Sequence, residues 1–205
     1  MKSIRLFLSI IFLCLIADFS CMHDKKYIHG GCCLSQGTLV RLSNGKDKLI
    51  ENLKAGDTVL AYDRVNDKFV SSRVLKMFQT EHDGFVKLTF KNKVEDFMQT
   101  AIVLSADHPV WVVDKGWCST EPETTKRVLM MKDVKKLEAG DNCYRSNDMH
   151  QQKKDPVPIL LTAIEKIKEP VRAYTIVQLE NKLDCFIANG IVVGTEAMSA
   201  ENGGE

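Results

Sequence analysis

The sequence Gly-Cys-Cys-Leu-Ser-Gln-Gly-Thr-Leu-Val occupies residues 31–40 and marks the point where the chain changes character. Before it, residues 22–31 are polar, end in Gly-Gly and carry no hydrophobic pattern, which is typical of a flexible tail. After it, apolar and polar residues begin to alternate, first in Thr-Leu-Val-Arg-Leu at residues 38–42. We therefore expect a folded domain with a thiol, that of Cys33, at its first position.

Short runs rich in β-branched and aromatic residues continue from there to the end of the chain. They are separated by roughly 8 to 12 residues, with Gly, Asn and Asp between them, and this spacing is typical of an all-β domain. No stretch carries a sustained apolar period of 3.6 residues, and Ser146 to Pro158 is a polar loop. The predicted β segments are Thr58–Tyr62, Phe69–Met77, Phe85–Phe90, Ala101–Leu104, Val110–Val113, Arg127–Met130, Leu160–Ile167, Ala173–Leu179 and Cys185–Val193.

The chain also repeats itself. Leu-Lys-Ala-Gly-Asp at residues 53–57 recurs as Leu-Glu-Ala-Gly-Asp at residues 137–141. The segment 104–112 has a similar counterpart at residues 185–193. The segment 74–88 has a further counterpart at 164–177. Three repeated segments in the same order predict two copies of one unit, arranged as a pseudo-two-fold all-β domain.

Composition limits the partners of the chain. Its 205 residues contain 28 Lys and Arg against 27 Asp and Glu, a net charge of +1. The basic residues are not clustered, so no nucleic-acid partner is expected. One domain of this size forms a sufficient core by itself, and we expect a monomer.

The first residues resemble a secretory signal. Lys2 and Arg5 precede an apolar run, Leu6 to Ala17, which is too short to span a bilayer. We expect a signal peptide at 1–20, ending between 17 and 21, and hence a secreted protein without a stable membrane span. The expected order is then a short leader (21–32), the autonomous β domain (33–194) and a flexible tail (195–205).

Seven cysteines in a secreted chain would normally form disulfides. With Cys14 and Cys21 set aside, five remain, an odd number that leaves at least one free thiol: Cys32, Cys33, Cys118, Cys143 and Cys185. The sequence contains no Cys-x-x-Cys, so neither a metal site nor a cofactor is expected.

Cys33 and His108 are the residues most suited to chemistry. A cysteine thiol can attack the carbonyl of the preceding residue through a five-membered ring, which moves the acyl group from nitrogen to sulfur. An imidazole can then protonate the departing amine, and His108 follows the hydroxyl of Ser105 by three residues. Together they predict cleavage of the Cys32–Cys33 peptide bond, with Ser105 orienting the ring or holding the scissile carbonyl. His23, His29, His82 and His150 lie in polar contexts and are expected to have no role.

These motifs resemble those of the Hint superfamily, which contains hedgehog autoprocessing domains, inteins and bacterial intein-like domains. The segment 33–40 resembles the family's initiating Cys followed by Gly-Thr-x-Val, and 53–57 resembles its Leu-x-x-Gly-Asp. Ser-Ala-Asp-His at 105–108 is similar to the family's Thr-x-x-His, and 186–193 resembles the C-terminal strand of inteins. The resemblance covers about Cys33 to Val193, and it implies a pseudo-symmetric Hint fold and a single-turnover autocatalytic cleavage through a thioester.

Departures from the family pattern limit the expected reaction. Splicing inteins end in Val-His-Asn, but Val193 is followed here by Gly194 and Thr195, so neither splicing nor C-terminal cleavage is expected. The hedgehog carboxylate for sterol transfer would fall in Met77–Thr80, which contains no acid, so a sterol acceptor is not expected. Water, a small thiol or an amine is the expected acceptor, with hydrolysis favoured.

Asp107, Asp184 and Cys185 are candidate supporting residues; Asp184-Cys185-Phe186 stands where the family usually has His-x-Phe. A Cys32–Cys33 disulfide would mask the nucleophile, and Cys118 and Cys185 are a second candidate pair. Three other functions stay open. A papain-like protease is disfavoured because 75 residues separate Cys33 from His108. A disulfide-held secreted binding module predicts paired thiols, and an inactive Hint domain would keep the fold without cleavage.

Overall fold

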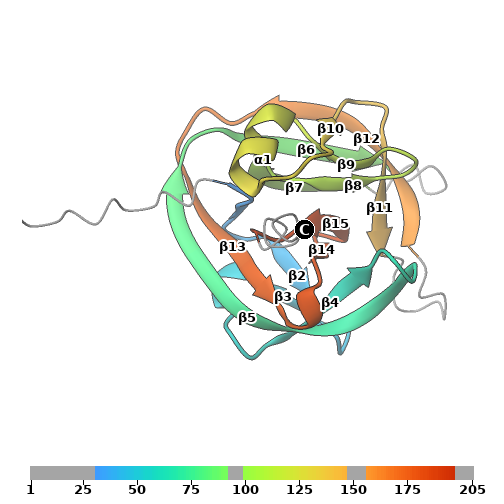
Figure 1. The fold of residues 1–205 in the computed structure, drawn as a ribbon. Coiled ribbons are helices and arrows are strands. Elements are labelled where there is room, and N and C mark those ends of the chain that lie inside the picture. Colours follow the sequence, from blue (N-terminus) through green and yellow to red (C-terminus); the bar gives the residue numbers. More distant parts are fainter. Residues whose placement is uncertain (1–30, 92–98, 147–155, 197–205) are drawn as a thin grey trace, which may run out of the picture.

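The computed structural model describes residues 31–91, 99–146 and 156–196, and these form the predicted all-β fold. Figure 1 shows long, strongly curved strands that bend around a central hairpin, with one short helix packed at the edge. The strands are β1 (Leu34–Ser35), β2 (Leu39–Arg41), β3 (Asp47–Leu49), β4 (Thr58–Asp63), β5 (Lys68–His82), β6 (Phe85–Lys91), β7 (Gln99–Ser105), β8 (Val110–Val112), β9 (Gly116–Ser119), β10 (Lys135–Lys136), β11 (Asn142–Ser146), β12 (Pro156–Lys166), β13 (Val171–Leu179), β14 (Cys185–Ala188) and β15 (Ile191–Gly194). The helix is α1 (Pro122–Leu129), and two 3-10 turns are η2 (Ile50–Asn52) and η3 (Glu180–Lys182).

The strands form one sheet that closes on itself. Its order is β10-β9-β8-β15-β11-β12-β6-β7-β1-β13-β5-β4-β14-β2-β3, and the pairing of β14 with β15 joins the two arms. Both strands of this hairpin are entirely buried and apolar, which is the pattern of strands covered on both faces. The single run predicted at Cys185–Val193 is thus a hairpin, turned by Asn189 and Gly190 with φ of 46° and 82°. Positive φ at both turn residues is what an Asn-Gly hairpin turn requires.

The internal repeat is a structural repeat. In one copy the Asp57 carboxylate accepts hydrogen bonds from Lys54 N and Lys48 Nζ, both at 2.8 Å. In the other, the Asp141 carboxylate accepts them from Glu138 N and Lys115 Nζ, both at 2.9 Å. Gly56 and Gly140 have φ of 96° and 105°, so each turn needs its glycine. The two loops therefore support the predicted pseudo-two-fold symmetry.

One predicted strand is wrong. Residues 127–130 were expected to be extended, but 127–129 end helix α1 and Met130 caps it with φ of 51°. Pro122 occupies the first turn, where its fixed φ suits a helix, while Thr125 and Leu129 are buried four residues apart. Two turns of helix are too short to reveal a 3.6-residue period in the sequence.

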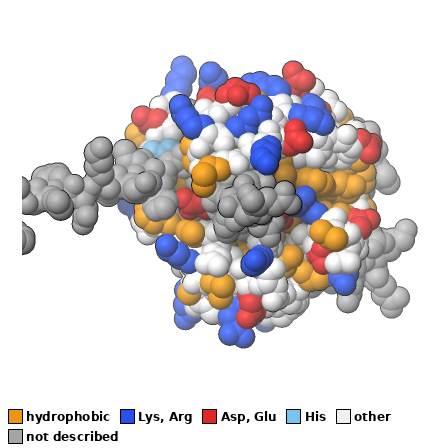
Figure 2. Space-filling model, viewed as in Figure 1, with side chains coloured by type: hydrophobic (Ala, Val, Ile, Leu, Met, Phe, Trp, Pro, Cys, Tyr) orange, Lys and Arg blue, Asp and Glu red, His pale blue; other side chains and the backbone are white. Residues whose placement is uncertain are grey.

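The described cysteines, Cys32, Cys33, Cys118, Cys143 and Cys185, are all free and buried. Neither the Cys32–Cys33 nor the Cys118–Cys185 disulfide is formed, so packing rather than cross-linking stabilises this fold. On the face in Figure 2, Lys and Arg are interspersed with Asp and Glu. Over the described ranges, no helix has the length and apolar character needed to cross a membrane.

Candidate active site around Cys33

The Cys32–Cys33 junction lies inside the fold. Both residues are 0% exposed. The Cys32 side chain packs in a cluster with Trp117, Cys185 and Val192, whereas Cys33 packs with Phe85 and Ala173. The two side chains of the junction thus enter different clusters, and the peptide bond between them is fixed on both sides.

The backbone at Cys32 is in the left-handed region, with φ of 61°. For a residue with a side chain this conformation costs on the order of 1–3 kcal/mol, and such strain is found most often at functional sites. The residue before it has little room, because a Cβ at Gly31 would lie 2.5 Å from Val128 Cγ1 and 3.0 Å from Asp107 Oδ2. A side chain at position 31 would therefore require Val128 to shift.

Ser105 joins the junction to strand β7. Cys33 N donates to Ser105 Oγ at 3.1 Å, and Ser105 N donates to the Cys33 carbonyl at 2.9 Å. Ser105 was expected to hold the scissile carbonyl or to orient the histidine. Its hydroxyl instead accepts from the nitrogen of the Cys32–Cys33 bond.

Helix α1 fixes the turn that follows Ser105. Thr120 Oγ1 and Glu121 N donate to the Ala106 carbonyl at 2.7 and 2.9 Å, and Thr125 Oγ1 donates to the Asp107 carbonyl at 2.7 Å. The Asp107 carboxyl interacts with the Ser105 hydroxyl and the Cys32 backbone. Burial raises its pKa, and these hydrogen bonds act in the opposite direction. Asp107 thus lies next to the junction.

His108 also lies against the junction. It is 1% exposed, and its ring adjoins backbone groups of Gly194, Cys33 and Cys32. Burial lowers the pKa of His108 to about 4, and those backbone groups only partly offset the effect. Neither ring nitrogen makes a hydrogen bond of normal geometry with another described residue. At neutral pH the ring is uncharged and able to accept a proton.

The thiols are protonated in this environment. Burial, followed by the charges of Asp107 and Glu196, raises the pKa of Cys33 to about 12, and Cys32 is raised by the same groups. The Cys33 thiol points toward the Gly31 carbonyl, with 3.7 Å between Sγ and the oxygen. Glu196 follows strand β15, whose end brings Thr195 to the site. Thr195 is fully buried, and its Oγ1 lacks a hydrogen bond within the described ranges.

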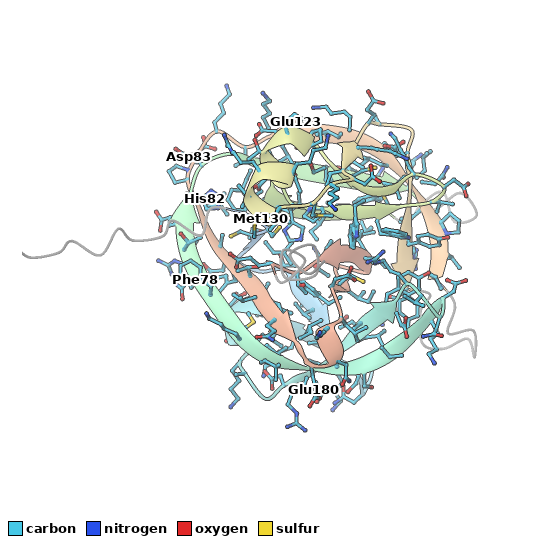
Figure 3. All side chains as sticks on the ribbon, in the orientation of Figure 1. Phe78, His82, Asp83, Glu123, Met130 and Glu180 are labelled. Carbon is cyan, nitrogen blue, oxygen red and sulfur yellow. The ribbon has the colours of Figure 1, made fainter. Side chains whose placement is uncertain are left out.

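Sequence reasoning assigned no role to His82, which the structure places near the site. Figure 3 shows it at the end of β5, beside Asp83 and on the side of α1 that carries Met130. A charge on His82 acts on the Asp107 carboxyl. The turn after His82 reaches the site through the Gly84 carbonyl, which accepts from Ala106 N at 2.8 Å. Only this tertiary contact reveals the histidine, because Glu-His-Asp-Gly in the sequence resembles an ordinary polar turn.

The other two supporting candidates have partners of their own. Asp184 forms an ion pair with Arg64, whose guanidinium lies over the Trp111 ring at 4.7 Å. Cys185 donates to the Tyr62 carbonyl at 3.0 Å. These contacts hold β14 against β4 and an aromatic cluster, so Asp184 and Cys185 support the fold near Cys32.

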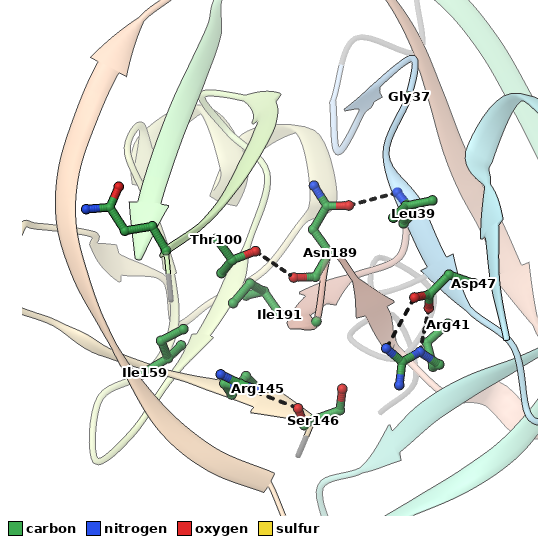
Figure 4. Close-up of a pocket in the computed structure, with 12 residues that line it drawn as sticks. Gly37, Leu39, Arg41, Asp47, Thr100, Arg145, Ser146, Ile159, Asn189 and Ile191 are labelled. Carbon is green, nitrogen blue, oxygen red and sulfur yellow. Dashed lines mark hydrogen bonds and ion pairs between the residues drawn. The ribbon is translucent and has the colours of Figure 1, made fainter. Parts of the chain in front are cut away.

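A cavity of about 410 Å³ lies at the other end of the same strands (Figure 4). It is lined by Thr100 near the start of β7 and Ile191 at the start of β15, whereas the Cys33 site uses the ends of these strands. Thr100 lies five residues before Ser105 in β7, which corresponds to roughly 17 Å along the strand. In its wall Arg41 pairs with Asp47. Among the described residues, no group of three or more His, Cys, Asp or Glu is arranged to hold a metal ion.

Comparisons with known proteins give two results. Residues 34–148 match the sequence model of the Ataxin-1 and HBP1 module, AXH. The chain is 25% identical over 177 residues to ataxin-1 of Homo sapiens, covering 82% of this chain and 20% of that protein. It is 28% identical over 109 residues to ataxin-1-like of Mus musculus, covering 53% of this chain and 16% of that protein. The chain thus spans about a fifth of the curated relatives it matches.

Solved structures with a similar fold are inteins and an intein-like domain. A DnaB intein from Synechocystis sp. PCC 6803 has a TM-score of 0.59 and 18% identity, covering 80% of this chain and 97% of that one. A bacterial intein-like domain from Clostridium thermocellum has a TM-score of 0.57 and 21% identity, covering 80% and 98%. At these identities the likeness shows the fold alone. It confirms the predicted all-β Hint fold, whereas the matching sequence family, AXH, was not anticipated from the motifs.

The predicted localisation is wrong. Ataxin-1 homologues with an AXH module are nuclear proteins, which is at odds with a secreted chain. The prediction depended on the apolar run Leu6–Ala17, which lies outside the described residues. A short apolar N-terminal segment by itself is weaker evidence for localisation than a family match over more than half of the chain.

Proposed function

The chain belongs to the AXH family, and we propose that this member is a self-cleaving module that breaks its own Cys32–Cys33 bond. The observation that carries the proposal is the position of this bond. Its nitrogen donates to Ser105 Oγ at 3.1 Å, and the His108 ring lies against the backbone on both sides of it. A peptide bond so placed, next to a thiol, is suited to an N-to-S acyl shift.

The reaction begins with attack of Cys33 Sγ on the carbonyl carbon of Cys32. Neutral His108 accepts the thiol proton and delivers it to Cys33 nitrogen as the C–N bond breaks and the C–S bond forms. Cys32, whose carbonyl carbon is attacked, is in the left-handed region, a backbone conformation found most often at functional sites. The result is a thioester between Cys32 and Cys33, with a free amine on Cys33.

The second step transfers the acyl group to water or to another small nucleophile. Gly194 and Thr195 occupy the positions where splicing would need a histidine and an asparagine, so the reaction stops at N-terminal cleavage. Hydrolysis releases residues 1–32 and leaves a domain that begins at Cys33, with its β fold ending near Gly194.

The raised pKa of Cys33 keeps its thiol in the protonated form. A thiol with a pKa of about 12 is almost entirely protonated at neutral pH. Attack therefore requires transfer of the thiol proton to His108 within the site.

A second candidate is a non-catalytic binding module that keeps the Hint fold. The family match favours it, because the curated relatives are ataxin-1 proteins. In this case the protonated, fully buried thiols would be part of the core, and the junction bond would remain intact.

Intact-mass measurements on the full chain separate the two candidates. The parent, Cys33→Ala and the matched control Cys143→Ala are followed for several days under reducing conditions, with and without hydroxylamine. Cys143 is also a fully buried cysteine but lies in the main core rather than at the junction. We expect the parent and Cys143→Ala to yield residues 33–205, with a hydroxamate at Cys32 when hydroxylamine is present.

Cys33→Ala should stay intact. A parent that already begins at Cys33 when purified also counts as cleaved. An unchanged mass of folded parent with hydroxylamine would overturn the proposal and leave the binding module.

A further inference from the structure

The turn between β5 and β6 places a second imidazole beside the Cys33 site. His82, the last residue of β5, lies opposite Val171 in the register with β13, and its ring contacts the Phe85 ring with centroids 4.8 Å apart. Phe85 packs in the same buried cluster as Cys33 and lies opposite Ser105 in the register with β7. His82 therefore borders the cluster that contains the nucleophile.

The orientation of the His82 ring leaves one nitrogen available. Nδ1 lies 2.6 Å from the Asp83 carbonyl oxygen, which has no proton to give, so Nδ1 carries the proton and donates it. Nε2 then presents a lone pair. This atom is buried and makes no hydrogen bond with any residue of the described part of the chain. Buried acceptors are almost always satisfied, so this position suits a water molecule.

The Asp107 carboxyl lies within electrostatic range of His82. Burial raises the pKa of the Asp107 carboxyl, and a positive charge on His82 counteracts that rise. Asp107 also interacts with the Ser105 hydroxyl and the Cys32 backbone, so this pair connects His82 to the junction. Asp83, by contrast, has an exposed side chain and contributes only its carbonyl.

We propose that His82 is the base of the second step, activating the water that hydrolyses the Cys33 thioester. The inference rests on the proposed function, since it needs that thioester. The water oxygen attacks the Cys32 carbonyl carbon and forms a C–O bond, while His82 Nε2 accepts one water proton. The C–S bond breaks, and the sulfur leaves with the bonding electrons and takes up the proton from Nε2. Cys32 ends as a carboxylic acid and Cys33 as a free thiol.

The two steps therefore use two different histidines. His108 lies against the backbone of both Cys32 and Cys33 and moves a proton from sulfur to nitrogen. His82 lies across Phe85, on the hairpin that borders the thiol, and moves a proton from water to sulfur. A strong nucleophile such as hydroxylamine needs no base to attack a thioester, so it depends on His108 alone.

The test compares hydrolysis with hydroxylamine cleavage in His82→Asn, His82→Gln and the control Asp83→Asn. An asparagine amide keeps the donor to the Asp83 carbonyl, and a glutamine amide occupies the Nε2 position without a usable base. Both variants should hydrolyse about 10²-fold more slowly than the parent. Their hydroxylamine cleavage should stay within about two-fold, and added imidazole should restore hydrolysis. Asp83→Asn should match the parent in both reactions.

Three results would decide against His82. Hydrolysis of His82→Asn at the parental rate would overturn the inference directly. An equal loss of hydrolysis and hydroxylamine cleavage in both variants would show that His82 only supports the fold. A parent that hydroxylamine cannot cleave would instead overturn the proposed function, and the inference with it.

Discussion

The turn that carries His108 and the turn that carries Asn189 occupy corresponding places in the two halves of the repeat, 81 residues apart. Each precedes a short buried strand, β8 in one copy and β15 in the other. The two turns differ in how their polar side chain is hydrogen-bonded. Both ring nitrogens of His108 lack a hydrogen bond of normal geometry with another described residue, whereas Asn189 uses its whole amide.

Asn189 links its own hairpin, β14 and β15, to strands β2 and β7. Its Oδ1 accepts from Leu39 N at 2.8 Å, its Nδ2 donates to the Ala101 carbonyl at 2.7 Å, and its backbone N donates to the Leu39 carbonyl at 2.8 Å. Its turn connects a paired hairpin, β14 with β15. The turn before β8 is instead buried, and it accepts hydrogen bonds from Thr120 and from Thr125 of α1. One copy of the unit therefore supplies stability, while the other holds an uncharged, buried imidazole next to Cys32, whose backbone is in the left-handed region.

The largest expected effect comes from replacing His108 by asparagine, the residue found at the corresponding position, 189, of the other turn. His108→Asn should slow cleavage of the Cys32–Cys33 bond by about 10³-fold, because an amide cannot carry the proton from sulfur to nitrogen. Thioester formation is measured by hydroxylamine cleavage and intact mass. The reciprocal control, Asn189→His, should leave the cleavage rate of the folded chain within a few-fold. Cleavage of His108→Asn within three-fold of the parent would remove His108 from the mechanism.

The pH dependence of stability offers a second test of the same contrast. An unfolded histidine binds a proton below pH 6.5, but folded His108 stays neutral down to about pH 4, so the unfolded state holds the extra proton in this window. Stability should therefore be complete above pH 6.5 and fall by about 3 kcal/mol as the pH drops to 4.

Urea unfolding of Cys33→Ala at pH 7 and pH 4.5 measures this loss without interference from cleavage. Adding His108→Asn should remove much of the difference between the two pH values. A loss of the same size with and without His108 would assign it to other groups.

The smallest expected effect is on the second turn. Asn189→Ala removes the two side-chain hydrogen bonds and should lower the free energy of unfolding by about 2 kcal/mol. Asn189→Gly loses the same bonds but tolerates the positive φ, so the difference between the two variants isolates the backbone strain. Both are measured by urea unfolding. Cleavage of the folded fraction should not change by more than about two-fold, and a larger change would couple this turn to the Cys33 site.

Much of the fold follows from the sequence because its signals are local. Alternating runs predicted most strands to within a few residues, for example Phe85–Phe90 against β6. The repeated Leu-x-Ala-Gly-Asp loops are self-contained, since each aspartate binds its own turn. Helix α1 was missed because its two turns carry no readable period, and its buried Thr125 and Leu129 depend on contacts with the rest of the fold.

The sequence by itself determined an all-β, two-fold repeated domain and singled out Cys33, Ser105 and His108, because strand period, turn chemistry and reactive residue type can be recognised within a few neighbouring residues. Only the tertiary structure decided how they are used. It placed the Cys32 backbone in the left-handed region and the Ser105 hydroxyl next to the nitrogen of the Cys32–Cys33 bond. It also brought His82 against Phe85, which packs in the same cluster as Cys33. Burial and distance between remote segments set these features, and both arise only when the two halves of the sheet close around β14 and β15.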